Sequence, residues 1–308
     1  MKLVTGGSGF FGSFLVKELL REDEVRVLDI KEPKTGGAEF VKGDVRAVED
    51  VKKALKGCDT VFHLASLLPQ SGASSKDVRD VIVAGSGNVF SCALDAGAKV
   101  VHVSSSSVFG QPRKVPYVED DPKAPLGMYG KGKLEAENLM AQYHAKGLNV
   151  VGLRPMTMVG PGIYGIFDRC LRWIKKGRPI PILGSGKNRM QMISVHDMAD
   201  ACMKAGQCDA AGEIMNIGSD NVPELREMFE TVFSMTGSKS RLIKLNTTLF
   251  RNIFRAGHFL HVSPLTPEHY LLMDKTFILD NSKAKRLMGW KPEYGNVDMI
   301  MDAYKGIN

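Results

Sequence analysis

The stretch Lys2-Leu-Val-Thr5-Gly-Gly-Ser-Gly-Phe-Phe-Gly12 decides the fold. Its first four residues read as a short strand, and Gly7-Ser-Gly9-Phe-Phe-Gly12 is a GxGxxG motif, extended by Gly6, that opens a helix. Glycines at these positions permit a tight turn and let a pyrophosphate approach the backbone N–H groups at the helix N-terminus. The order strand, glycine turn, helix therefore predicts a dinucleotide-binding α/β domain.

An acidic residue at the end of the second predicted strand complements the glycine loop. Asp29 lies 17 residues after Gly12, where its carboxylate can accept both ribose hydroxyls of an adenosine and repel a 2′-phosphate. We therefore expect NAD as the cofactor, while Lys31, two residues further on, keeps NADP as the alternative. Asp44, after the third strand, is a candidate for the adenine amino group, and a helix-capping role is its alternative.

Strands and helices alternate along the first half of the chain. Strands are predicted over 2–5, 25–29, 39–42, 60–64, 99–103 and 149–153, and helices over 14–20, 50–55, 78–96 and 131–145. Such an order predicts an α/β fold with a doubly wound parallel sheet of the Rossmann type, covered on both faces.

The pattern changes after Gly160, where prolines separate shorter and more mixed elements. We expect residues 1–160 to form an NAD-binding domain and residues 161–308 to form mainly a smaller substrate-binding portion. The two are expected to interleave, because residues 190–218 include a stretch that resembles the main layer again.

Composition excludes several classes of protein. The net charge is +7, but no block of five like charges occurs, so we expect no nucleic-acid partner. The five cysteines form no CxxC pair, which gives little support to disulfides or to a metal site. No apolar run approaches the roughly 18 residues of a membrane span, and glycines stand where a signal peptide would be apolar. A cytoplasmic protein without a membrane partner is the expectation.

Two further segments predict catalytic chemistry. A strand ending at Val103 runs into Ser104-Ser-Ser-Ser107, and Tyr129-Gly-Lys-Gly-Lys133 follows at the start of a helix. Tyr129 and Lys133 are four residues apart and share one helix face. The ammonium stabilises the phenolate and so makes Tyr129 a general base near neutral pH. A serine at the carboxyl end of a parallel strand can bind the same substrate oxygen.

With these residues in view, the chain resembles the extended short-chain dehydrogenase/reductase family, in its NAD-dependent epimerase/dehydratase group, over nearly the whole length. The motifs that carry the resemblance are residues 5–12, Val27-Leu-Asp29, Gly43-Asp44, His63-Leu-Ala65, the serine run, Tyr129 with Lys133, Leu153-Arg154-Pro155, Gly160-Pro161-Gly162, Val195-His-Asp197-Met-Ala199, Asn216-Ile-Gly218 and Leu287-Met-Gly-Trp-Lys-Pro292.

The resemblance implies a role for each matching residue. Tyr129 is the acid/base, Lys133 tunes it and binds the ribose, and Ser105 meets the substrate hydroxyl, with Ser106 as the alternative. The implied cofactor contacts are Gly6, Gly9, Phe10, Phe11, Gly12, Asp29, Asp44, Val45, Leu64, Ala65, Ser66, Tyr129, Lys133 and Pro155. The family also suggests a homodimer formed through helices 78–96 and 131–145.

Departures from the family pattern bear on the substrate. Ser106 and Ser107 stand where 4,6-dehydratases carry acids, which disfavours dehydration. Thr157 replaces a usual asparagine beside the substrate, and Arg189 is a candidate for a substrate phosphate, with a surface arginine as the alternative.

We therefore expect an NAD-dependent enzyme that oxidises a secondary alcohol, and favour a 4-epimerase acting on a nucleoside-diphosphate sugar. A net dehydrogenase or reductase of a sterol-like or other small alcohol, of the 3-beta-hydroxysteroid dehydrogenase type, is the alternative. A non-catalytic NAD-sensing protein is disfavoured by the intact Tyr129 and Lys133.

Overall fold

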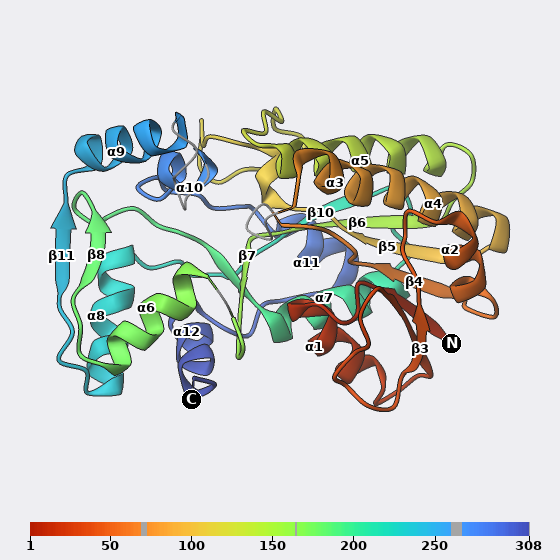
Figure 1. Ribbon diagram of the computed structural model, residues 1–308, viewed down its shortest axis with the longest axis horizontal. Coiled ribbons are helices and arrows are strands. Elements are labelled where there is room, and N and C mark those ends of the chain that lie inside the picture. The colour runs from red at the N-terminus through yellow and green to blue at the C-terminus, as the bar shows by residue number, and fades with distance from the viewer. Residues whose placement is uncertain (69–72, 164, 260–266, 308) are drawn as a thin grey trace.

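A seven-stranded parallel sheet forms the centre of the computed structural model, which describes residues 1–68, 73–163, 165–259 and 267–307 (Figure 1). The strand order is β10-β6-β5-β4-β1-β2-β3. The strands are β1 (Lys2–Thr5), β2 (Val25–Asp29), β3 (Glu39–Lys42), β4 (Thr60–His63), β5 (Lys99–Val103), β6 (Val150–Pro155) and β10 (Ile214–Ile217). This order confirms the predicted doubly wound α/β fold.

Helices cover both faces of the sheet, and the central strands are accordingly apolar and buried. All of β4 and β6 is buried, as a parallel sheet with two covered faces requires. One face carries α2 (Val48–Leu55), α3 (Ser75–Arg79), the π-helical turn η2 (Asp80–Ala84), α4 (Gly85–Ala96) and α5 (Met128–His144). The other face carries α1 (Phe10–Leu19), α7 (Val195–Gln207) and α11 (Ser282–Met288), as Figure 1 shows.

All four predicted helices differ from the observed ranges, and the second, predicted over 50–55, begins at Val48. The first begins at Phe10 rather than Phe14, because Gly9 caps it and Gly12 packs in its first turn against the glycine loop. The predicted helix over 78–96 is wrong as one α-helix, since the π-helical turn η2 separates α3 from α4. The hydroxyl of Ser86, at the start of α4, donates to the carbonyl of Ile82 in that turn. The helix predicted over 131–145 begins at Met128, which places Tyr129 in its first turn.

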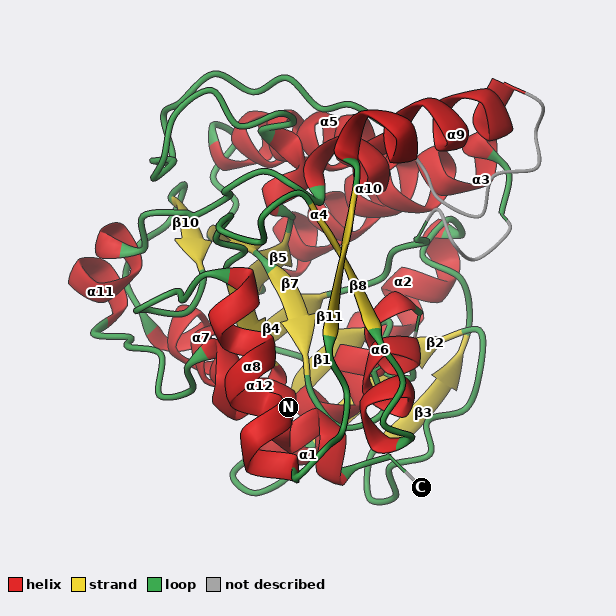
Figure 2. Ribbon diagram, turned by 90° about the vertical axis from the view of Figure 1, so that its left-hand side faces the viewer, coloured by secondary structure: helices red, strands yellow, loops and turns green. Residues whose placement is uncertain are grey.

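A smaller unit lies beside the sheet and holds its own apolar cluster, which includes Leu171, Ile182 and Met299 (Figures 1 and 2). Its elements are α6 (Ile166–Lys175), β8 (Ile180–Leu183), α8 (Leu225–Thr236), β11 (Leu242–Leu245), α9 (Thr247–Phe259), α10 (Pro267–Leu272) and α12 (Asn296–Lys305). Strands β8 and β11 pair in parallel. None of the helices in the described ranges is long and apolar enough to cross a membrane.

The chain passes between the two units more than once. Strand β7 (Thr157–Val159) pairs with β9 (Met192–Ser194), after which α7 packs on the main sheet and β10 adds to its edge beside β6. Helix α11 then packs over the same face, with Trp290 fully buried behind it. The use of residues 161–308 for substrate binding stays a prediction.

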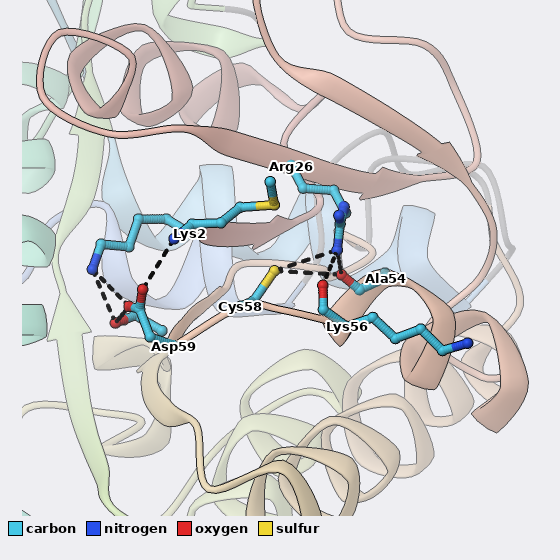
Figure 3. Close-up of polar contacts among 8 residues, drawn as sticks. Lys2, Arg26, Ala54, Lys56, Cys58 and Asp59 are labelled. Carbon is cyan, nitrogen blue, oxygen red and sulfur yellow. Dashed lines mark hydrogen bonds and ion pairs between the residues drawn. The ribbon is translucent and has the colours of Figure 1, made fainter.

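Two cationic side chains connect strands β1 and β2 to the segment between α2 and β4 (Figure 3). Arg26 on β2 donates to the carbonyls of Ala54, 2.8 Å away, and Lys56, 2.6 Å away. These carbonyls end α2 and have no partner within the helix, so the guanidinium takes the place of the missing N–H groups. Lys2 on β1 similarly binds Asp59, just before β4, with an Nζ–Oδ1 distance of 2.7 Å.

The close packing of α1 on the glycine loop leads to a testable expectation. A Cβ atom at Gly12 would lie 2.3 Å from the Gly6 carbonyl oxygen and 2.7 Å from the Gly7 Cα. Both are backbone atoms, so Gly12→Ala must displace the loop, and we expect a loss of about 1–3 kcal/mol in the free energy of unfolding. Urea unfolding without added nucleotide measures it.

Gly36→Ala is the matched control, since no atom lies within 4 Å of the added Cβ. We expect its unfolding midpoint to stay at that of the parent protein. Equal midpoints for both variants would contradict the close approach.

Candidate active site

The glycine loop joins β1 to α1 at the carboxyl edge of the sheet. Gly6 has a φ of +74°, and a Cβ there would lie 2.8 Å from the backbone of Ala65, so only glycine fits. Gly9 is the N-cap of α1, and no side chain caps this helix end. The first N–H groups of α1 are therefore placed for an anion. Phe11 is buried in the core, so only its backbone can serve a cofactor, while Phe10 is half-buried.

Asp29 ends β2 directly beside this loop. Its carboxylate accepts hydrogen bonds from the backbone N–H groups of Ser8, at 3.0 Å, and Lys31, at 3.1 Å. The Ser8 hydroxyl also donates to the Lys31 carbonyl. The loop and the strand end are thus held together, and the partly exposed carboxylate keeps lone pairs for ribose hydroxyls.

Asp44 and Val45 follow β3. The Asp44 carboxylate pairs with Arg46, with an Oδ2–Nη2 distance of 2.6 Å, and hydrogen bonding to this guanidinium lowers the pKa of Asp44. An adenine amino group would therefore share the carboxylate with Arg46. Val45 is buried, and Asn88 donates to its carbonyl at 2.9 Å.

Leu64, Ala65 and Ser66 continue from β4 along the same edge. The Leu64 N–H donates to the Thr5 carbonyl, and the Ala65 backbone lies against Gly6. The Ser66 hydroxyl is buried without a hydrogen-bond partner in the described part of the chain. A buried polar group without a partner is costly, so this hydroxyl fits a site completed by a polar ligand. The glycine loop, Asp29 at the end of β2 and the Ser66 hydroxyl together fit the binding of a dinucleotide.

Lys133 is buried beneath Tyr129 on α5. Its Nζ lies 5.9 Å from the centre of the Tyr129 ring and donates to the Val103 carbonyl, 2.8 Å away, at the end of β5. Burial lowers the pKa of Lys133 to about 8, although the carboxylate of Glu137 raises it. Near pH 7 this amine is still mainly an ammonium, in reach of the phenol that it would tune.

The serine segment follows β5 and packs against the start of α5. A Cβ at Gly130 would lie 2.7 Å from the Ser107 carbonyl oxygen, so this glycine lets the turn carrying Tyr129 approach. Ser105 and Ser106 are both buried, and the Ser105 hydroxyl donates to that of Ser107 at 3.1 Å. The assignment of Ser105 rather than Ser106 to the substrate stays a prediction.

The predicted substrate residues come from other segments. Pro155 ends β6 and is buried, whereas Thr157 on β7 and Arg189 are exposed. The backbone of Arg189 is fixed by Thr276 and Phe277, with Arg189 N–H donating to Thr276 Oγ1 at 3.1 Å. The structure thus holds the Arg189 backbone and leaves the side chain at the surface.

A buried network beside Lys133 was missed by sequence reasoning. Glu137 forms two hydrogen bonds with Arg154, each 2.8 Å long, and accepts the Ser104 hydroxyl at 2.6 Å. Glu137 is 4% exposed and Arg154 3%. The sequence did contain a signal for this network. Arg154 lies inside the apolar strand Val150–Pro155, and a buried arginine needs an acidic partner.

Two histidines lie behind the site on adjacent strands. His63 and His102 stack with ring centres 5.4 Å apart. His63 is held by the hydroxyls of Thr5 and Ser86, and burial lowers its pKa to about 3. His102 is equally buried, but neither ring nitrogen has a hydrogen-bond partner among the described residues. Both rings are neutral under ordinary conditions.

Comparison with known proteins places this site in context. The model of the NAD dependent epimerase/dehydratase family matches residues 2–218. The protein y4nG of Sinorhizobium fredii is 35% identical over 98% of this chain and 77% of its own length. A UDP-N-acetyl-alpha-D-glucosaminuronate decarboxylase of Bacillus cytotoxicus is 28% identical over 78% of this chain and 82% of its own length.

A UDP-glucose 4-epimerase of Vibrio cholerae is 28% identical over 94% of this chain and 90% of its own length. Among solved structures, MoeE5 in complex with UDP-glucose and NAD has a TM-score of 0.81 and 27% identity, covering 99% of this chain and 97% of its own. The named relatives include a decarboxylase and a 4-epimerase of UDP-sugars, so membership of the family leaves the type of reaction open.

The position of Asp29 predicts the choice of cofactor. We expect NAD to bind at least about tenfold more tightly than NADP, a margin of about 1.4 kcal/mol, because the carboxylate would repel a 2′-phosphate. Asp29→Asn keeps the size of the side chain and one accepting oxygen but removes the charge. It should therefore reduce the difference between the affinities for NAD and NADP, mainly because NADP binds more tightly. Calorimetry with both nucleotides measures the two affinities.

Thermal unfolding of the Asp29→Asn variant without nucleotide is the control for damage to the loop, since this side chain also binds the Ser8 N–H. Equal affinities of the parent protein for NAD and NADP would contradict the assignment of Asp29 to the adenosine ribose.

Proposed function

Because the chain belongs to the NAD-dependent epimerase/dehydratase family, we propose that it oxidises a secondary alcohol of a nucleoside-diphosphate sugar and acts as a 4-epimerase. The observation that carries the proposal is the buried Lys133, held by the Val103 carbonyl below the Tyr129 ring and next to the serine segment. No such arrangement is needed for binding a nucleotide alone.

The cofactor side of the site would be formed by the ends of three strands, β1, β2 and β4. The glycine loop and the uncapped α1 would take the pyrophosphate, Asp29 the adenosine ribose, and Ser66 a polar group of the dinucleotide. NAD, when bound, supplies the acceptor and donor of a hydride.

Tyr129 moves the proton of the reaction. Its phenolate oxygen would take the proton of the substrate hydroxyl and return it later, while a serine hydroxyl at 105 or 106 holds the same oxygen in place. Lys133 stabilises the phenolate as long as it is an ammonium, so its role weakens as pH rises through about 8. In an epimerase the resulting ketone turns over in the site and is reduced on its other face.

The residues near the reacting groups favour this reaction over elimination of water. Ser106 and Ser107 offer no carboxylate to abstract a proton from carbon or to protonate a leaving hydroxide. Thr157 is exposed near the end of β6, and Arg189 presents a cation from the neighbouring segment. We assign Arg189 to the diphosphate of the substrate.

Interconversion of UDP-glucose and its 4-epimer by the NAD-loaded protein tests the proposal. Product formation without net NADH is expected, since an epimerase returns the hydride. NADH accumulating in proportion to the sugar nucleotide, or to another alcohol, would instead identify a net dehydrogenase.

The decisive variant is Tyr129→Phe, which deletes one oxygen and keeps the ring. We expect kcat to fall by roughly 10²–10⁴, the usual contribution of a positioned general base, with little change in NAD affinity. Tyr143→Phe on the same helix is the matched control, and its kcat should match that of the parent enzyme. Near-native turnover in Tyr129→Phe would contradict the proposal that Tyr129 is the general base.

Arg189→Ala tests the substrate assignment. A ligand that binds the folded state raises the melting temperature by mass action, so UDP should protect the parent protein from thermal unfolding. The Ala variant should lose this protection and keep that of NAD, because its backbone contacts to Thr276 and Phe277 remain. Arg21→Ala, beyond the far end of α1, is the control and should keep both shifts. If UDP protected Arg189→Ala as well as the parent protein, the assignment of Arg189 to the substrate diphosphate would be wrong.

A further inference from the structure

We propose that Glu137 is a positioning residue of this site, holding the helix that carries Tyr129 and Lys133 to the strand ends that carry Ser105 and Pro155. The inference rests on the proposed function and adds to it a residue that touches neither substrate nor cofactor.

The connections of Glu137 are direct. Its Oε1 accepts from Ser104 at 2.6 Å and from Arg154 Nε at 2.8 Å, and its Oε2 accepts from Arg154 Nη2 at 2.8 Å. Each partner is the chain neighbour of a predicted site residue, because Ser104 precedes Ser105 and Arg154 precedes Pro155. One carboxylate thus joins α5, β5 and β6 at the edge where the reaction would occur.

The network extends one step further through Arg154. Its Nη1 donates to the Glu119 carbonyl at 2.9 Å, and the Glu119 carboxylate accepts the backbone N–H of Asn216 on β10. The guanidinium also lies over the Phe109 ring, 5.1 Å from its centre. The ion pair thus joins the residues before Ser105 and Pro155 to α5 and to the loop that carries Glu119, which a pair serving stability alone would not require.

Glu137 also acts on Lys133 through its charge. The two residues are one helical turn apart on α5, and the carboxylate favours the ammonium that burial disfavours. The other groups around Lys133 cannot replace it. His63 and His102 are neutral, since burial lowers the pKa of each, and Tyr129 is the group to be tuned. Arg154 is a cation, and Lys123, whose own pKa is lowered by burial and Arg154, is another.

Glu137→Gln keeps the shape of the side chain and removes its charge. Lys133 then loses the anion that favours its ammonium, and each pKa unit lost changes the ratio of ammonium to amine tenfold. From a pKa of about 8, a loss of one to two units lowers the ammonium fraction at pH 7 by about two- to tenfold. We expect kcat at pH 7 to fall by about that factor and to recover in part toward pH 10, where the phenol ionises without help. The affinity for NAD should change little.

Glu135→Gln is the matched control, because Glu135 is a partly exposed residue of the same helix that pairs with Arg79 at 2.8 Å. Its kcat and pH profile should equal those of the parent enzyme. Ser104→Ala removes only the hydrogen bond to β5, so it should lower kcat less than Glu137→Gln and leave the shape of the pH profile unchanged.

If Glu137→Gln leaves Arg154 without a counter-charge and the protein fails to fold, Glu137→Gln with Arg154→Met removes both charges and keeps the volume filled. The same loss at pH 7 and recovery at high pH are expected of it. A lowered melting temperature with an unchanged pH profile, in whichever variant folds, would reduce Glu137 to a structural residue and overturn the inference. Near-native turnover of Tyr129→Phe would instead overturn the proposed function, so the two failures are distinguishable.

Discussion

The parallel register of the central strands is the constraint on which the rest of the structure depends. Thr5 on β1 pairs with His63 on β4, His63 with His102 on β5, and Val103 with Leu153 on β6. In a parallel sheet, strands in such register end at one edge. The glycine loop, the segment 64–66, the serine run and Pro155 therefore converge, although they lie far apart in the chain.

Burial of charge is the second determinant of this site. Lys133, Glu137 and Arg154 are each almost fully buried, and a buried charge persists only when it is paired and hydrogen-bonded. The Val103 carbonyl and the carboxylate of Glu137 keep the lysine charged at neutral pH, whereas the surrounding apolar strands lower its pKa. The same enclosure keeps the neighbouring histidines neutral. An ammonium among neutral rings is the electrostatic condition under which a tyrosine can serve as a base.

Local patterns were sufficient for the fold and for the chemical class. A GxGxxG motif between a strand and a helix, an acid at the end of the next strand, and a tyrosine four residues before a lysine each have a mechanism within a few residues. Apolar runs predicted six of the seven strands of the sheet, because buried parallel strands are short and continuously apolar, whereas the edge strand β10 was not predicted as a strand. The helix boundaries were less accurate. Gly9 and Gly12 suggested a loop where the helix had already begun, and no local signal marks the π-helical turn after Arg79.

By itself, then, the sequence determined a parallel α/β fold, a glycine loop of the dinucleotide-binding pattern and the Tyr129–Lys133 pair, because these depend on residues close together in the chain. Only the tertiary structure decided that Glu137 meets Arg154 and Ser104, and that the Ser66 hydroxyl is buried with no hydrogen-bond partner among the described residues. These facts depend on which strands are neighbours and on how deeply each side chain is enclosed. Pairing and burial are properties of the packed sheet and its helices, and no single segment carries them.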